Sequence, residues 1–244
     1  MKPKNKRKMF FIISGCVLLT VLAVGVTFAY LNDRKTADNV FTVGDVYLKI
    51  EEPNYPEQES SRKMVAYSKV SKDPIIKNTG TNDEFVFMKV TVPLEEVTLI
   101  TDGTKGEKQK QEIFNIISND ENKKTLTENP GFSYNSDWLY IESQTSGNTA
   151  SYVFAYKKIL LASVNTTADT INRVETEPLF DEVQLKGVLE GDILENALEN
   201  IKIEAYGIQS DNMYGVPDLN VDSPTDDQLK EIYNIYVRQN GGTA

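Results

Sequence analysis

Residues 85–93 read Phe-Val-Phe-Met-Lys-Val-Thr-Val-Pro, and this stretch decides the fold class. β-branched and aromatic side chains dominate it, which is typical of a β-strand. Lys89 is its only charged residue, so we expect both faces of the strand to be at least partly covered. Pro93 fits the end of the strand because proline has no backbone N–H to donate to a neighbour.

A shorter apolar run, residues 75–77, precedes this strand, and a cluster of turn-forming residues separates the two. The pattern predicts a β-hairpin that runs from 75–77 into 85–92. Its turn is expected at Lys77, Asn78, Thr79 and Gly80.

Period-2 patterns recur along the chain and predict an all-β protein. Further strands are expected at 40–50, 64–70, 97–101, 138–142, 151–161, 183–189 and 201–209. The aromatic residues Tyr152, Phe154 and Tyr156 share one strand face, and we expect core packing there rather than a carbohydrate platform. About eight strands with few helices favour an antiparallel, jelly-roll-like β-sandwich.

Two helices are expected outside the strands. Mixed apolar spacing at 107–118 predicts a short surface helix within a polar, turn-rich insertion at 102–137. Ser223 as N-cap and Pro224 at the first helical position predict a C-terminal helix at 224–239. Its apolar face is formed by Leu229, Ile232, Tyr233 and Tyr236.

The N-terminus predicts export. Residues 1–8 are basic, and 9–29 are uncharged and apolar, as in a secretory signal peptide. Cleavage is expected between Ala29 and Tyr30, which leaves a secreted protein of the extracellular matrix or cell surface. The apolar run is also long enough to span a bilayer, so an uncleaved anchor is the alternative. In both cases the body is translocated, and this segment is its one expected link to a membrane.

Composition excludes much chemistry. The formal charge is −10, and it falls to −15 without residues 1–29, which disfavours nucleic-acid binding. The chain has no histidine, and Cys16 in the apolar run is its only cysteine. Histidine-based catalysis and zinc sites are therefore excluded, and we expect no catalytic residues, no metal and no cofactor. The pattern Asp218-x-Asn220-x-Asp222 lacks the glycine and the glutamate of a calcium loop.

Four segments, in order along the chain, resemble the proteins exported through a SipW-type signal peptidase. They are GVTFAYLND with NVFTVGDV (25–46), KDPIIKNTGTNDEFVFMKVTVP (72–93), VTLITDGTKGEKQKQEIFNI (97–116) and IKIEAYGIQSDN (201–212). The third segment is similar to the BsaA-type biofilm matrix branch, a relative of the TasA and camelysin proteins. Asp33 stands three residues after Tyr30, one more than in that group.

This resemblance implies a jelly-roll subunit that polymerises with copies of itself into extracellular fibres. Residues 1–29 would be the signal peptide, 30–43 a donor strand for the next subunit and 44–244 the β-sandwich domain. The expected donor anchors are Tyr30, Leu31, Val40, Phe41 and Val43. For 40–43 the alternative is the first strand of the same subunit's sandwich.

The resemblance also implies that signal cleavage is the switch for assembly and that Lys–Asn isopeptide bonds can join subunits, although no pair is singled out by sequence. A monomeric or membrane-anchored surface-binding module is the alternative function. A camelysin-like protease is a further one, which the absence of histidine disfavours.

Overall fold

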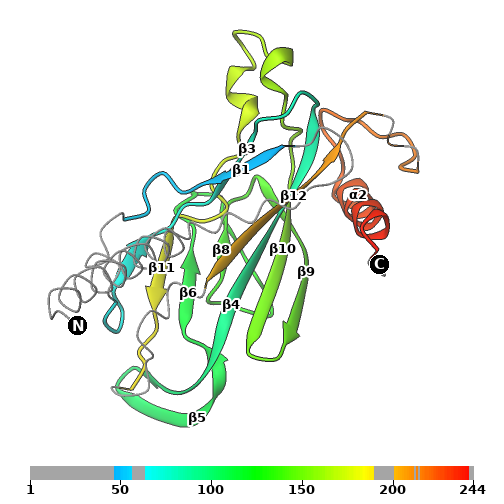
Figure 1. Ribbon diagram of the computed structural model, residues 1–244. Helices are drawn as coiled ribbons and strands as arrows, with labels where there is room; N and C mark the ends of the chain where they lie inside the picture. The colour runs from blue at the N-terminus through cyan, green and yellow to red at the C-terminus, as the bar shows by residue number, and fades with distance from the viewer. Residues whose placement is uncertain (1–46, 57–63, 190–200, 212, 214, 242–244) are drawn as a thin grey trace, which may run out of the picture. The chain divides into compact units, whose positions relative to one another are not determined.

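The computed structural model describes residues 47–56, 64–189, 201–211, 213 and 215–241 (Figure 1). The chain divides into two units, 1–36 and 37–244, and all described residues belong to the second. None of the described residues forms a helix long and apolar enough to cross a membrane. The expected signal segment 1–29 and the expected donor 30–43 lie outside the described residues.

The described part of the chain is predominantly β-structure with antiparallel sheets, which confirms the expected fold class at that level. Its strands are β1 Leu48–Glu51, β2 Lys69–Ser71, β3 Ile75–Asn78, β4 Glu84–Thr101, β5 Thr104–Glu112, β6 Phe114–Ile117, β7 Lys124–Thr125, β8 Ser133–Tyr134, β9 Trp138–Ser146, β10 Thr149–Tyr156, β11 Glu182–Leu185 and β12 Lys202–Gln209. Its helices are the short 3-10 turns η2 Ser163–Asn165 and η3 Ile171–Val174, and α2 Asp226–Gln239.

The strands form one large sheet and three smaller ones. The large sheet has the order β12-β4-β10-β9, and β5 pairs with the second part of β4. A three-stranded sheet has the order β2-β11-β6, while β1 pairs with β3 and β7 with β8. In Figure 1, β4 runs through the middle of the large sheet with β10 and β9 on one side of it.

Strand β4 has two buried faces because its apolar residues continue on both sides of the pleat. Val86, Met88 and Val90 belong to the core shared with the three-stranded sheet, whereas Phe85 and Phe87 belong to the core under α2. All five residues are 0% exposed, which confirms the expectation of a strand covered on both faces. The ladder with β10 ends at Pro93, and β4 pairs with β5 from Leu94 onward, so the strand itself continues past the proline.

Helix α2 covers the outer face of the large sheet. Its buried side chains are the expected Leu229, Ile232, Tyr233 and Tyr236. Its N-cap is Thr225, however, and not the expected Ser223. The Thr225 hydroxyl accepts from the N–H of Gln228 at 3.2 Å, and the Gln228 side chain accepts from the Thr225 N–H at 3.0 Å. This reciprocal capping box stabilises a start two residues later.

The expected helix at 107–118 is wrong, because this segment forms β5 and β6. Asp102 and Gly103 have positive φ angles of 50° and 75° and connect β4 to β5 as a two-residue turn. Such turns match the twist of paired strands, and Asp-Gly is a favoured sequence for them. The Asp-Gly turn and the pairing with β4 therefore make this segment a strand, although its mixed apolar spacing is compatible with a helix.

The expected hairpin from 75–77 into 85–92 is also wrong, because β3 pairs with β1. Residues 84–93 of β4 are occupied on their two edges by β12 and β10. The turn after β3 instead carries the chain from the small sheet to the large one.

Candidate functional site

The predicted turn residues lie together at the end of β3. The Asn78 Oδ1 accepts from the Gly80 N–H at 2.8 Å, and its Nδ2 donates to the Asn82 carbonyl at 2.8 Å. Thr79 donates to the Tyr47 carbonyl through both its N–H, at 2.8 Å, and its hydroxyl, at 3.0 Å. The turn therefore holds Tyr47, the first described residue, beside the end of β3.

The other predicted site residues lie outside the described residues. They are the cleavage residues Ala29 and Tyr30 and the donor anchors Leu31, Val40, Phe41 and Val43. The expected core reading of Tyr152, Phe154 and Tyr156 is confirmed, since all three side chains are buried in the core.

The edge strands of the sheets are the surfaces to which a strand of another chain can pair. Among the described strands, β12 and β9 are the two end strands of the large sheet, and β2, β5, β9 and β12 are among those that pair with one strand only. The Glu142 carboxylate of β9 accepts from the Tyr233 hydroxyl at 3.0 Å, which joins this edge to α2. Sequence reasoning found the strand at 138–142 but gave no sign that it lies at an edge.

A buried acid, Glu84, is the first residue of β4 and lies between Gln209 of β12 and Leu160. The backbone N–H of Glu84 donates to the Leu160 carbonyl at 2.9 Å, and the Leu160 N–H donates to the Glu84 carbonyl at 3.0 Å. Glu84 is 0% exposed, and neither oxygen of its carboxyl group has a hydrogen-bond partner among the described residues. Burial, with a smaller contribution from the charge of Asp83, raises the pKa of Glu84 to about 8. The carboxyl group is therefore mostly protonated at pH 7.

A second polar cluster joins β5, β10 and the segment before β8. The Tyr152 hydroxyl donates to Glu112 Oε1 at 2.5 Å, and Asn129 Nδ2 donates to Glu112 Oε2 at 2.6 Å. Burial, followed by this hydrogen bond, raises the pKa of Tyr152. Burial lowers the pKa of Lys186, and the negative charge of Glu112 partly opposes this shift. Because both oxygens of Glu112 accept hydrogen bonds, we interpret this cluster as a brace between elements.

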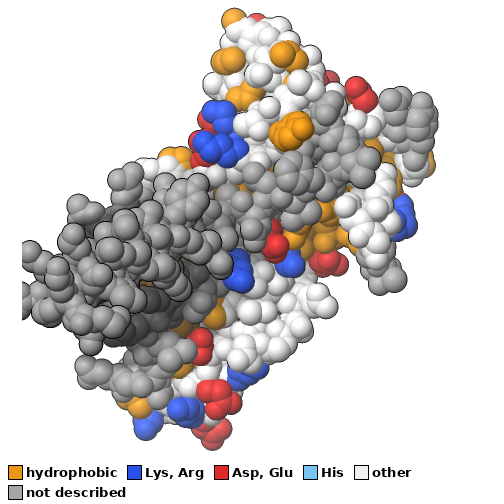
Figure 2. Space-filling model, in the orientation of Figure 1, with side chains coloured by type: hydrophobic (Ala, Val, Ile, Leu, Met, Phe, Trp, Pro, Cys, Tyr) orange, Lys and Arg blue, Asp and Glu red, His pale blue; other side chains and the backbone are white. Residues whose placement is uncertain are grey.

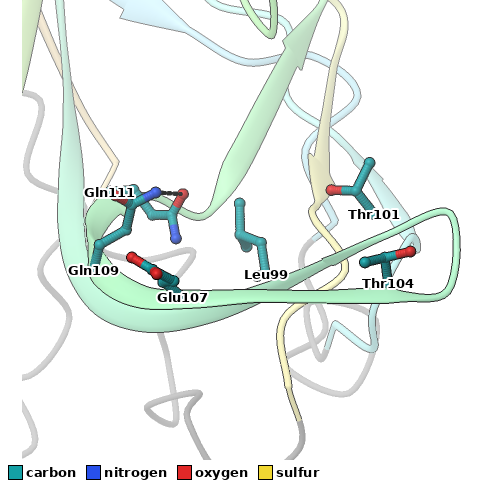
Figure 3. A pocket seen from close by; sticks show the side chains of 7 residues that line it. Leu99, Thr101, Thr104, Glu107, Gln109 and Gln111 are labelled. Carbon is teal, nitrogen blue, oxygen red and sulfur yellow. Dashed lines mark hydrogen bonds between the residues drawn. The ribbon is translucent and has the colours of Figure 1, made fainter.

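A shallow groove lies along the β4–β5 hairpin (Figure 3). Its volume is about 300 Å³, and its lining includes Leu99, Glu107, Gln109 and Gln111. The Gln109 amide donates to the Gln111 oxygen at 3.4 Å, and Gln111 donates to the Val97 carbonyl at 3.1 Å. These bonds hold the two amides against the hairpin and leave one carboxylate in the groove.

No cluster of three potential metal ligands occurs within the described ranges. On the face shown in Figure 2, basic side chains are interspersed with acidic ones. Comparisons with protein-family models, with curated proteins and with solved structures gave no match. Function is therefore inferred from the residues of this chain and from the resemblance of its motifs.

Proposed function

We propose that this chain is an exported structural subunit of extracellular biofilm matrix fibres, in which a strand from one subunit joins a sheet of the next. The observation that carries the proposal is an antiparallel β body whose strands β2, β5 and β9 each have one partner among the described residues. An unpaired strand edge presents a row of N–H and C=O groups that another strand can satisfy. The resemblance of residues 25–46 and 97–116 to matrix proteins supports the same class.

The donor in this proposal is the segment 30–43, which becomes N-terminal when a SipW-type peptidase cuts between Ala29 and Tyr30. A donor on one subunit and an acceptor edge on another make a head-to-tail contact that does not close on itself. Such contacts propagate as filaments. Before the cut, the donor is joined to a membrane-length apolar run, so cleavage starts assembly. The body is a jelly-roll-type sandwich in this proposal.

Electron microscopy and sedimentation of two proteins test the proposal. One begins at Tyr30, and the other begins at Gly44 and lacks the donor. We expect concentration-dependent filaments from the first protein and monomers from the second. Monomers from both at every concentration would favour a monomeric or membrane-anchored surface-binding module. Filaments from both proteins would show that residues 30–43 are not the donor strand.

A further inference from the structure

The described strand edges differ in their protection against pairing with another chain. Natural edge strands are protected by lysines, by short length, by proline or by a covering segment. β5 carries three lysines, and β2 has three residues. β12, at the other end of the large sheet, begins with Lys202 and packs beside β1. The outer side of β6 is covered, because the Ile116 N–H donates to the Gly131 carbonyl at 2.8 Å. β9 has nine residues, WLYIESQTS, with no lysine, arginine or proline.

The first half of β9 has apolar side chains that are incompletely covered. Leu139 and Ile141 are half-buried against the core under α2, and Tyr140 is half-buried against the other core. A strand added beside β9 would therefore bury apolar surface on both faces and pair the backbone. This part of the edge has two protective features, which are a register shift against β10 between Val153 and Phe154 that bends β9, and a hydrogen bond between the Tyr134 side chain and the backbone of Tyr140.

We propose that β9 is the acceptor edge for the segment 30–43 of a neighbouring copy, an inference that rests on the proposed function. The donor is mostly polar at 32–39 and ends in the apolar run Val-Phe-Thr-Val at 40–43. β9 has the opposite order, since 139–141 are apolar and 142–146 are polar and exposed. Antiparallel pairing brings the two apolar runs together, whereas parallel pairing places each beside polar residues.

Chain length favours a neighbour's β9 over the subunit's own. Residues 44–46 separate the donor from Tyr47, which Thr79 fixes beside the β1–β3 sheet. The four chain steps from Val43 to Tyr47 span at most about 14 Å. β1 packs beside β12, at the opposite end of the large sheet from β9. A strand added outside β9 lies four strand spacings from β12, or about 19 Å. The apolar end of the donor therefore starts too far from its own β9.

Charge variants of the protein that begins at Tyr30 test the edge. Gln144→Lys with Ser146→Lys places two lysines on the exposed part of β9, and Thr104→Lys with Gln109→Lys places the same charge on exposed β5. We expect the β9 variant to need about tenfold more protein to form filaments, because edge lysines oppose strand addition. The β5 variant should assemble like the unsubstituted protein.

The outcomes separate the two proposals. If the unsubstituted protein forms filaments and the β9 variant assembles equally well, β9 is not the acceptor, while the proposed function stands. If the unsubstituted protein forms no filaments, the proposed function itself fails. Circular dichroism of both variants verifies that the fold is retained.

Cysteine pairs test the contact and its direction in a second measurement. The protein from Tyr30 onward contains no cysteine. Oxidation of a Thr42→Cys, Leu139→Cys protein should give a ladder of disulfide-linked multimers in a denaturing gel. The Thr42→Cys, Thr145→Cys protein, which matches parallel pairing, should stay mostly monomeric. A ladder from the second protein only overturns the antiparallel arrangement, and internally linked monomers from the first place the donor on its own subunit.

Discussion

Replacement of Glu84 by glutamine should remove a large pH dependence of stability. Glu84 is 0% exposed, its carboxyl oxygens have no hydrogen-bond partner in the described part of the chain, and burial raises its pKa from 4.5 to about 8. An acid whose pKa is raised in the folded state binds its proton more tightly there than in the unfolded chain. Its stabilising effect is therefore fully present below pH 4.5 and is lost as the pH rises to about 8.

The magnitude follows from the distance between the two pKa values. Each pH unit between them changes the free energy of unfolding by about 1.4 kcal/mol, so the interval from 4.5 to about 8 corresponds to about 5 kcal/mol. A typical domain has a net stability of about 5–15 kcal/mol. Ionisation of this single carboxyl group therefore removes a large share of the stability of the fold.

Urea unfolding of the protein that begins at Tyr30, at several pH values between 5 and 9, measures this effect. We expect unsubstituted protein to lose about 4 kcal/mol over this range, because it covers about 3 of the pH units between the two pKa values, and the Glu84→Gln variant to lose much less. The two proteins should be similar near pH 5, because both then carry a neutral side chain. An exposed matched control, Glu121→Gln, should change stability by no more than about 0.5 kcal/mol. Equal pH slopes for the unsubstituted and Glu84→Gln proteins would refute the reasoning.

Three further substitutions test local packing by urea unfolding at pH 7. A Cβ atom on Gly187 would lie 2.5 Å from the Ile100 carbonyl oxygen, so Gly187→Ala should cost about 1–3 kcal/mol, and an unchanged midpoint would contradict this contact. Thr225→Ala removes the cap of α2 and should cost about 1 kcal/mol, with a matching loss of helical circular dichroism. Tyr152→Phe removes a donor to the Glu112 carboxylate and should cost about 2 kcal/mol; no loss would mean that the brace is not stabilising.

The sequence predicts best where local pattern and burial agree. Strand β12 shows the expected alternation, with Ile203 and Ala205 buried and Lys202 exposed. α2 shows the expected apolar face because its i, i+3, i+4 spacing is unambiguous. β4 is recognisable because its apolar content is continuous over 85–92.

Predictions fail where a long-range partner decides the outcome. The segment 75–77 and the turn after it form as expected, but β1 and not β4 is the partner of β3. Nothing in the spacing of residues 75–92 encodes that β12 and β10 already occupy both edges of β4. Likewise Glu84 follows Asn82 and Asp83 in sequence and resembles a surface residue. Its backbone pairs with Leu160, which is distant in sequence, so the local sequence does not reveal its burial.

The buried acid and the open edge act on different equilibria. Glu84 affects the folding of each subunit, whereas lysines at Gln144 and Ser146 affect pairing between subunits. Glu84 lies at the start of β4, whereas the two β9 positions lie next to the turn into β10, on a different strand. Substitutions without shared partners are normally additive in free energy. A protein with all three changes should therefore show the pH slope of Glu84→Gln and the assembly concentration of the β9 variant. If the Glu84→Gln change alone shifted the assembly concentration at pH 5, where its side chain and that of glutamate are both neutral, strand addition would involve the core around Glu84 and not the β9 edge alone.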